Sequence, residues 1–346
     1  MHIPDGYLSP QTSIPLIAAM VPIWGVALKK VKKVIEARQV PLLALCASFS
    51  FVIMMLNVPV FGGSSAHAVG AVFIAILLGP FPACIAVSTA LFIQAVVFGD
   101  GGILAFGANC LNMAFIMPFT GYYIYKAIRG KAEIGSKRGL AALFIGSYTG
   151  LNLAALFASI EFGIQPLLFH TANGTPLYGI YPLSVSIPSM MFAHLLFAGP
   201  IEGIITVTAV AYLAKYAQHM FANENTVRLT PTGSFFPRYR AFIIPLTVLV
   251  VLTPLGLIAQ GTAWGEWGSD EIKGMFGYIP AGFAKFADFW HALMPGYTVA
   301  PLEGSFLSSS VGYIISAVVG IALISSVLIL SSLISRKISK GSEKVG

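Results

Sequence analysis

The sequence predicts an all-α protein that crosses a membrane several times. Hydrophobic residues make up 57% of the 346 residues and charged residues only 10%, with a mean hydropathy of +0.83. A water-soluble domain carries about a quarter charged residues, so most of this surface has to face lipid. Several apolar runs also reach the length of about 17–25 residues that a spanning helix needs. The net charge of +7 does not indicate a nucleic-acid partner, because the basic residues lie between these runs.

The apolar runs predict nine spanning helices. Eight of them fall near 12–28, 40–61, 82–98, 103–125, 139–160, 187–214, 241–260 and 310–333. The run at 68–80, which ends at Pro80, is either a short span or a buried half-span, and we count it as a span. The polar stretch 220–240 then separates a module of about seven helices from a two-helix appendix.

We therefore expect three parts: a membrane module at 1–220, a cytoplasmic linker at 221–240 and a two-span region at 241–346. The last part contains a long outer connection at about 261–308, which is too long for a simple turn and is expected to be partly ordered.

The basic residues predict how the chain is oriented. Nearly all of the 20 Lys and Arg residues lie in alternate connections or in the tail, as the positive-inside rule expects of cytoplasmic segments. These groups are Lys29, Lys30, Lys32, Lys33 and Arg38; Lys126, Arg129, Lys131, Lys137 and Arg138; Lys215, Arg228, Arg238 and Arg240; and Arg336, Lys337, Lys340 and Lys344. Nine spans then place the N-terminus outside the cell membrane and the C-terminus in the cytoplasm. Because no basic residue precedes the first apolar run, we expect the opening stub to remain uncleaved on the outer surface.

The stub MHIPDGYLSP carries a possible chelating group at its start. The α-amine of Met1, the amide nitrogen of His2 and Nδ1 of the His2 imidazole can bind one ion through a five-membered and a six-membered ring. These three donors occupy three corners of a square, and square-planar nitrogen coordination suits Ni(II) or Cu(II). By itself a Met-His start is more often a frayed terminus, so the interpretation depends on a fourth donor.

That donor is predicted to be His67. It follows the second span in NVPVFGGSSAHAVG, and the predicted topology places it on the same side as Met1. A single histidine at a membrane edge is usually a hydrogen-bonded structural residue. Two histidines on one side, one of them in a chelating terminus, favour a shared ion.

Together with LLGPFPACIAVSTALFIQAVVFGDGGILAFGANCLNMAF, the stub and GGSSAH resemble the CbiM/NikM family over about residues 1–220. The resemblance implies the substrate-capture component of an energy-coupling-factor importer for Ni(II), or alternatively for Co(II). It implies Met1, His2 and His67 as metal ligands and no resident cofactor. It also implies partners: a coupling transmembrane subunit of the CbiQ/NikQ type and cytosolic ATPases of the CbiO/NikO type. The region around PLGLIAQGTAWGEW resembles the small partner NikN or CbiN, fused here to the module, although it lacks the acidic residues of that partner's PDGLE-type motif.

Further polar residues are candidates for holding the metal ligands in place. The turn Phe98–Gly102 contains Asp100, which either orients a ligand or stabilises the turn, and Ser65 precedes His67 within the small-residue segment. Gln94, Asn109 and Asn112 lie in apolar runs, where they are expected to bond across helices or to line the metal site.

His194 and Glu202 also lie within one span. An ionisable residue inside a membrane is a functional candidate, and we expect a structural pair or a contact between subunits.

Rival functions find less support. The sequence contains neither an H-E-x-x-H motif nor a paired acid and base that would indicate a metalloenzyme, and we predict that the protein is not an enzyme. A passive cation channel would need rings of carboxylates within the spans. The absence of a G-x-x-x-x-G-K-[ST] phosphate loop assigns ATP hydrolysis to partner chains. A third alternative is a structural adaptor role for the C-terminal region.

Cys46, Cys84 and Cys110 fall within apolar runs, and we predict that they are buried free thiols.

Overall fold

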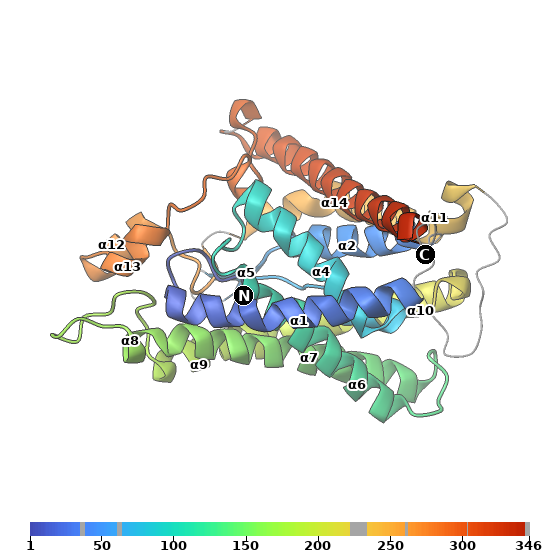
Figure 1. Cartoon of the computed structure of the whole chain (residues 1–346), viewed down its shortest axis with the longest axis horizontal. Coiled ribbons are helices and arrows are strands. Elements are labelled where there is room, and N and C mark those ends of the chain that lie inside the picture. Colours follow the sequence, from blue (N-terminus) through green and yellow to red (C-terminus); the bar gives the residue numbers. More distant parts are fainter. Residues whose placement is uncertain (35–38, 61–63, 222–233, 260–261, 303, 343–346) are drawn as a thin grey trace.

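The computed structural model describes residues 1–346 except 35–38, 61–63, 222–233, 260–261, 303 and 343–346 (Figure 1). The long helices are α1 (Pro10–Val34), α2 (Val40–Met54), α4 (Pro80–Ile93), α6 (Met117–Arg129), α7 (Lys137–Gly163), α9 (Leu183–Ala193), α10 (Gly199–Tyr216), α11 (Phe235–Leu252) and α14 (Phe306–Ser342). The short ones are α3 (Ala71–Leu78), α5 (Phe106–Asn109), α8 (Gln165–Leu168), α12 (Ser269–Phe276) and α13 (Ala281–Phe286). Strands β1 (Val58–Val60) and β2 (Ser64–Ala66) pair in antiparallel fashion.

Within the described residues, 6 helical stretches are long and apolar enough to cross a membrane. They are Pro10–Lys32, Pro80–Phe98, Lys137–Leu168, Leu183–Tyr216, Phe235–Ile258 and Phe306–Ile334. These stretches support the prediction of a mostly helical, multi-pass membrane protein. The segment 222–233 of the expected linker lies outside the described residues, and α11 already begins at Phe235.

The expected span at 68–80 is a half-span. Helix α3 has 8 residues and is about 12 Å long, whereas the hydrocarbon core of a bilayer is about 30 Å thick. Gly70 and Gly79 end the helix on both sides with φ of 72° and 95°. Every residue of α3 is buried by protein, so its length is set by the neighbouring helices. The expected span at 40–61 is also shorter than predicted, because the chain leaves α2 for the hairpin of β1 and β2.

Three helices contain a wider π-helical segment, at Gln94–Phe98, Cys110–Ile116 and His194–Ala198. The second and third are followed closely by Pro118 and Pro200. A proline has no N–H for the ordinary i to i−4 bond, and a wider turn accommodates its ring. Such segments change the direction of the side chains within a helix, and each of these three adjoins the surroundings of the N-terminal stub.

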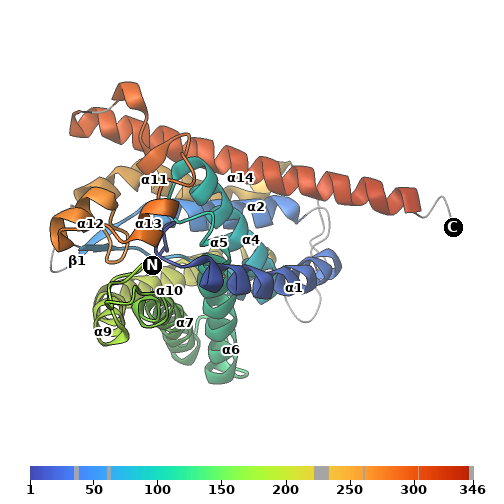
Figure 2. The same cartoon turned by 60° about the vertical axis from the view of Figure 1, so that its left-hand side comes forward.

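The helices run mostly along one axis of the molecule. Figure 1 shows α12 and α13 at one end and the C-terminus at the other. In Figure 2, α14 crosses the molecule above α2, against which it packs. Helices α6 and α7 approach closely at Gly121, where an added Cβ would lie 2.9 Å from the carbonyl oxygen of Gly146. Small residues at such crossings let two helices in lipid pack tightly.

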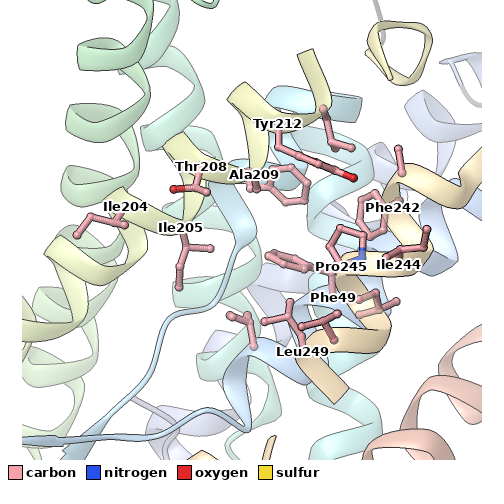
Figure 3. A pocket seen from close by; sticks show the side chains of 16 residues that line it. Phe49, Ile204, Ile205, Thr208, Ala209, Tyr212, Phe242, Ile244, Pro245 and Leu249 are labelled. Carbon is pink, nitrogen blue, oxygen red and sulfur yellow. The ribbon is translucent and has the colours of Figure 1, made fainter. Parts of the chain in front are cut away.

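An apolar cavity of about 500 Å³ lies between α10, α11, α2 and α3 (Figure 3). Apart from the hydroxyls of Thr208 and Tyr212, its lining is hydrocarbon, with Phe49, Phe73 and Phe242 among the side chains. It offers no imidazole or carboxylate, so this cavity does not suit a metal ion.

Candidate metal centre

The N-terminal stub folds into the molecule. Met1 is 4%, His2 2% and Ile3 0% exposed. The Asn109 side chain holds the stub on both sides of Ile3: its oxygen accepts the Ile3 N–H at 2.8 Å, and its nitrogen donates to the Ile3 carbonyl at 3.1 Å. The N–H of Gly102 donates to the same carbonyl at 2.8 Å. The terminus expected on the outer surface is therefore buried.

Asp5 anchors the stub a second time. Its carboxylate accepts the backbone N–H groups of Ile103, Leu104 and Ala105 at distances of 3.0, 2.8 and 3.3 Å. Burial raises the pKa of Asp5, and the three N–H groups partly offset that effect. These donors satisfy a carboxylate that would otherwise be costly to bury.

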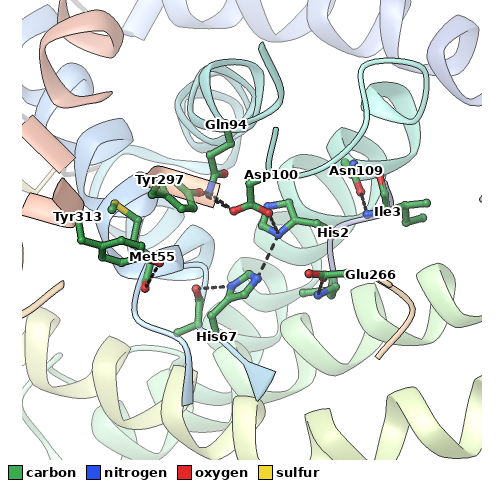
Figure 4. A network of polar contacts seen from close by, with 12 residues as sticks. His2, Ile3, Met55, His67, Gln94, Asp100, Asn109, Glu266, Tyr297 and Tyr313 are labelled. Carbon is green, nitrogen blue, oxygen red and sulfur yellow. Dashed lines mark hydrogen bonds and ion pairs between the residues drawn. The ribbon is translucent and has the colours of Figure 1, made fainter. Parts of the chain in front are cut away.

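His2 and His67 face each other at the inner end of the stub. Nδ1 of His2 lies 3.2 Å from Nε2 of His67, and the ring centroids are 4.9 Å apart (Figure 4). Nδ1 of His2 also lies 3.2 Å from an oxygen of Asp100. Both histidines are buried, and the sequence prediction that the two lie close together is met by their positions.

The surroundings of His67 select one form of its imidazole. Its Nδ1 lies 3.1 Å from the carbonyl oxygen of Ala68, an acceptor that requires a proton on Nδ1. Nε2 then carries the lone pair and faces His2. Burial, together with the Met1 amine and the His2 ring nearby, lowers the pKa of His67 well below its usual value. The ring is therefore neutral at neutral pH, as a metal ligand has to be.

The residues around His2 do not form a metal site from side chains alone. Among the described residues, no group of three or more His, Cys, Asp or Glu side chains is placed to hold a metal ion. Adjacent corners of a square with metal–nitrogen bonds of about 2 Å lie about 2.8 Å apart. The 3.2 Å between the two imidazole nitrogens is close to that spacing.

Asp100 belongs to a second polar network. The Tyr297 hydroxyl donates to one Asp100 oxygen, and the Gln94 amide donates to that oxygen at 3.2 Å and to the Tyr297 hydroxyl at 2.8 Å. Burial and the Asp100 charge raise the pKa of Tyr297 well above its usual value, so the hydroxyl keeps its proton. Among the described residues Tyr297 is the one non-glycine with a positive φ, 62°. Such backbone strain often accompanies a functional site.

The turn around Asp100 has a backbone that depends on its glycines. Gly99 and Gly101 have φ of 66° and 82°, in the left-handed region that favours glycine. Gly102 instead lets the Asp5 side chain lie close to the backbone of the turn, because an added Cβ would lie 2.2 Å from an Asp5 carboxylate oxygen. The turn thus carries Asp100 toward His2 and receives the stub at Gly102.

The other predicted residues have different surroundings. Asn112 donates to Glu161 at 2.7 Å, which is the bond between helices that its position predicts. Ser65 is buried in β2 opposite Pro59, and within the described residues its side chain joins none of the bonds around His2. The three cysteines are buried and free, as predicted.

The expected pair of His194 and Glu202 does not form. Nδ1 of His194 bonds to the carbonyl of Met190 at 2.8 Å, one turn back in its own helix. Glu202 instead accepts the backbone N–H groups of Val69 and Gly70, with distances of 2.8 to 3.1 Å. The π-helical segment between the two residues turns them away from each other, which spacing on a regular helix does not reveal.

Two residues near the stub come from the C-terminal region and were not predicted. Glu266 accepts the Met1 amine at 3.1 Å, and Tyr297 binds Asp100. The sequence predicted only that the connection at about 261–308 is partly ordered, without naming either residue. Their positions depend on packing across more than 190 residues of chain, which no local pattern encodes.

The connection between α11 and α14 covers the stub. The Tyr7 hydroxyl donates to the Trp267 carbonyl at 2.9 Å, and the Tyr7 ring packs edge-on against Phe283. On the other side, Trp290 and the N–H of Met294 donate to the carbonyls of Val96 and Val97, each at 2.8 Å. These contacts hold the connection between α11 and α14 against the stub and against the helix end that precedes Asp100.

Comparison with known proteins shows that the chain is similar to metal transport proteins. The sequence pattern of CbiM, described as the cobalt uptake substrate-specific transmembrane region, matches residues 2–220. The fused nickel transport protein NikMN of Rhodobacter capsulatus is 46% identical over 339 residues, covering 94% of this chain and 95% of that protein. The probable fused nickel transport protein LarMN of Lactiplantibacillus plantarum is 45% identical, covering 93% and 95%. A solved structure described as a truncated transition metal transporter is 55% identical, with a TM-score of 0.59, and covers 62% of this chain and 99% of its own.

Proposed function

The chain belongs to the CbiM family of cobalt uptake transmembrane regions, as a nickel or cobalt transport protein of the NikMN and CbiM type, and we propose that it captures Ni(II) for an ATP-driven importer. It is a transport component and not an enzyme. The observation that carries the proposal is the 3.2 Å approach of His2 Nδ1 to His67 Nε2 beside a buried terminal amine.

In the proposed site four nitrogens surround the ion in a plane. The Met1 amine, the His2 amide and His2 Nδ1 form the two chelate rings, and His67 Nε2 takes the corner opposite the amide. This order makes the two imidazole nitrogens neighbours, as their distance suggests. The Asp100 carboxylate beside His2 would offset part of the positive charge of the ion.

Nickel is proposed as the transported ion and cobalt as the alternative. A strong-field d8 ion favours loss of the amide proton and a square plane, which supports Ni(II). Relatives named for nickel transport and relatives named for cobalt transport both match this chain. The NikMN and LarMN proteins, which match more than 90% of it, are named for nickel.

The energy for transport is proposed to come from other chains. The sequence contains no G-x-x-x-x-G-K-[ST] motif, and we propose a coupling transmembrane subunit of the CbiQ/NikQ type and ATPases of the CbiO/NikO type. The basic ends of the helices would face these ATPases in the cytoplasm, and the stub would face outward from the cell membrane.

The region 241–346 is proposed to act as a NikN/CbiN-like cover for the module at 1–220. Its support is the set of bonds by which the connection before α14 meets the stub and the turn at Asp100. In this arrangement the ion could leave or enter only when the cover or the stub moves.

Titration of the purified chain with Ni(II) tests the proposed site. His2→Ala, His67→Ala and one residue added before Met1 should each abolish high-affinity binding, and the wild-type complex should show the absorption of a square-planar ion. His170→Ala is the matched control, because His170 is exposed and bonds locally to Thr171. Unchanged affinity in the extended chain, or an octahedral spectrum, would overturn the proposal. Parallel titration with Co(II) decides between the two ions.

A further inference from the structure

Glu202 holds the chain segment that carries His67. Its side chain is 0% exposed within α10. One carboxylate oxygen accepts the Val69 N–H at 2.8 Å, and both oxygens accept the Gly70 N–H, at 3.0 and 3.1 Å. Two successive N–H groups are held by one side chain, so this is a firm attachment of the segment to α10.

A single peptide unit joins Glu202 to His67. The N–H of Val69 points to Glu202, while the carbonyl of Ala68, in the same peptide unit, accepts from Nδ1 of His67 at 3.1 Å. A peptide unit is planar and rigid, so its N–H and its C=O cannot turn independently. A rotation that breaks the bond to Glu202 therefore also displaces the acceptor that orients the imidazole.

We propose that Glu202 is a positioning residue for His67. Through this peptide unit the carboxylate fixes the rotation of the imidazole, keeps the proton on Nδ1 and turns Nε2 toward His2. The chain of bonds from carboxylate to amide to imidazole also makes Nε2 a stronger electron donor, since hydrogen bonds in series polarise one another. The inference rests on the proposed function, because it concerns the ion only if His67 is a ligand.

The competing role for Glu202 is to anchor α3 without affecting the metal. The segment has a second attachment that allows the two roles to be separated. The Ser50 hydroxyl in α2 donates to the Val69 carbonyl at 2.8 Å, and Gly70 packs on the Phe49 ring. With this hold in place we expect the chain to fold without Glu202, but with an imidazole that is free to rotate.

The test is a double-mutant cycle on the purified full-length chain, titrated with Ni(II) alone and followed by visible absorption. Glu202→Ala should weaken Ni(II) binding about 10- to 100-fold, the range for residues that orient a metal ligand. Its spectrum should shift toward that of His67→Ala. In the His67→Ala background the same change should cost less than about twofold, because the ligand through which Glu202 acts is already missing.

Thr206→Val is the matched control. Thr206 lies one turn further along α10, is 0% exposed, and its hydroxyl has no hydrogen-bond partner in the described structure. Wild-type affinity and spectrum are expected for this variant. Should Glu202→Ala fail to fold, Glu202→Gln gives the same comparison, because its amide can accept one N–H but opposes the other.

Two results would overturn the inference: wild-type affinity and spectrum in the Glu202 variant, or an equal loss of affinity with and without His67. Failure of the proposed function is a different result, in which His67→Ala itself leaves binding unchanged.

Discussion

Met1 and Glu266 form an ion pair of 3.1 Å although 265 positions separate them in the chain. The amine is buried, and the Glu266 side chain is 19% exposed. The pair ties the first residue of the membrane module to the connection between α11 and α14. Any movement of this connection that breaks the pair would loosen the stub at the proposed ion.

Removal of this tie should speed the release of the ion. A coordinated amine still has N–H groups for the Glu266 carboxylate, and a partly buried ion pair contributes about 1 kcal/mol. We therefore expect Glu266→Ala to release Ni(II) about fivefold faster, which corresponds to that free energy. A chain truncated after residue 240 should still bind the ion but release it faster again. Stopped-flow transfer to a chelator measures both rates.

Asp270→Ala is the control for this prediction. It removes an exposed carboxylate from the same connection, without a contact to the stub. Equal release rates in the wild type and in Glu266→Ala would show that the ion pair does not hold the stub.

The charge of Asp100 should contribute to metal affinity. Its carboxylate lies 3.2 Å from Nδ1 of His2, close enough to stabilise a bound cation. Asp100→Asn keeps the shape but loses the charge, and we expect roughly tenfold weaker Ni(II) binding. Tyr297→Phe should have a smaller effect in the same direction, because Asp100 loses the donor that orients it. Equilibrium titration with Ni(II) measures both effects, and Asp288→Asn, which changes an exposed carboxylate, is the control. Equal affinities of the wild type and Asp100→Asn would contradict the prediction.

The sequence predicted that His2 and His67 lie close together, with Asn109 and Asp100 beside them, but it did not predict the contacts made by Glu202, Glu266 and Tyr297. The fourth position followed from topology, since two histidines on one side of a membrane can meet. Positive φ at Gly99 and Gly101 is consistent with the residue type, since glycine adopts this conformation without strain. The contacts of Glu202, Glu266 and Tyr297 join segments more than 130 residues apart, and hydropathy or local spacing contains no information about such pairs.

The half-span α3 shows another limit of hydropathy. An apolar run predicts burial, but it does not distinguish burial in lipid from burial in protein. Helix α3 is covered by α4, α6 and α10, so its 8 residues do not have to match the bilayer. The composition of the run at 68–80 therefore fits a span and a buried half-span equally well.

The stability of the metal-free chain should fall between neutral and mildly acidic pH because of His67. Burial keeps the pKa of this histidine well below the usual value of 6.5, which the unfolded chain retains. Below about pH 6.5 the unfolded chain therefore binds a proton that the folded chain does not, and stability is lost as the pH decreases.

The difference in melting temperature between the wild type and His67→Asn isolates this effect. The melting temperatures of the two proteins are measured in detergent with a chelator at pH 7.5 and pH 5.5. The other titrating groups affect the wild type and the variant alike, so their contribution cancels in the difference. The wild type should lose more stability on acidification than the variant. An equal loss would mean that His67 does not titrate differently in the folded and unfolded chains.

Gly102 should be required for the stub to reach its buried position. An added Cβ would lie 2.2 Å from an Asp5 carboxylate oxygen and 2.5 Å from the Asp5 nitrogen, distances at which the stub must move. The carboxylate cannot give way freely, because the N–H groups of residues 103–105 hold it. We expect Gly102→Ala to displace the stub and to weaken Ni(II) binding at least tenfold, since the amine and His2 would leave their places together.

Gly274→Ala is the control and should bind Ni(II) like the wild type. Gly274 is a helical glycine in α12, and no atom lies within 4 Å of the added Cβ. Titration together with protease sensitivity of the N-terminus measures both consequences. If Gly102→Ala binds Ni(II) normally with a protected terminus, then the stub does not need this close approach, and the glycine is there for the turn alone.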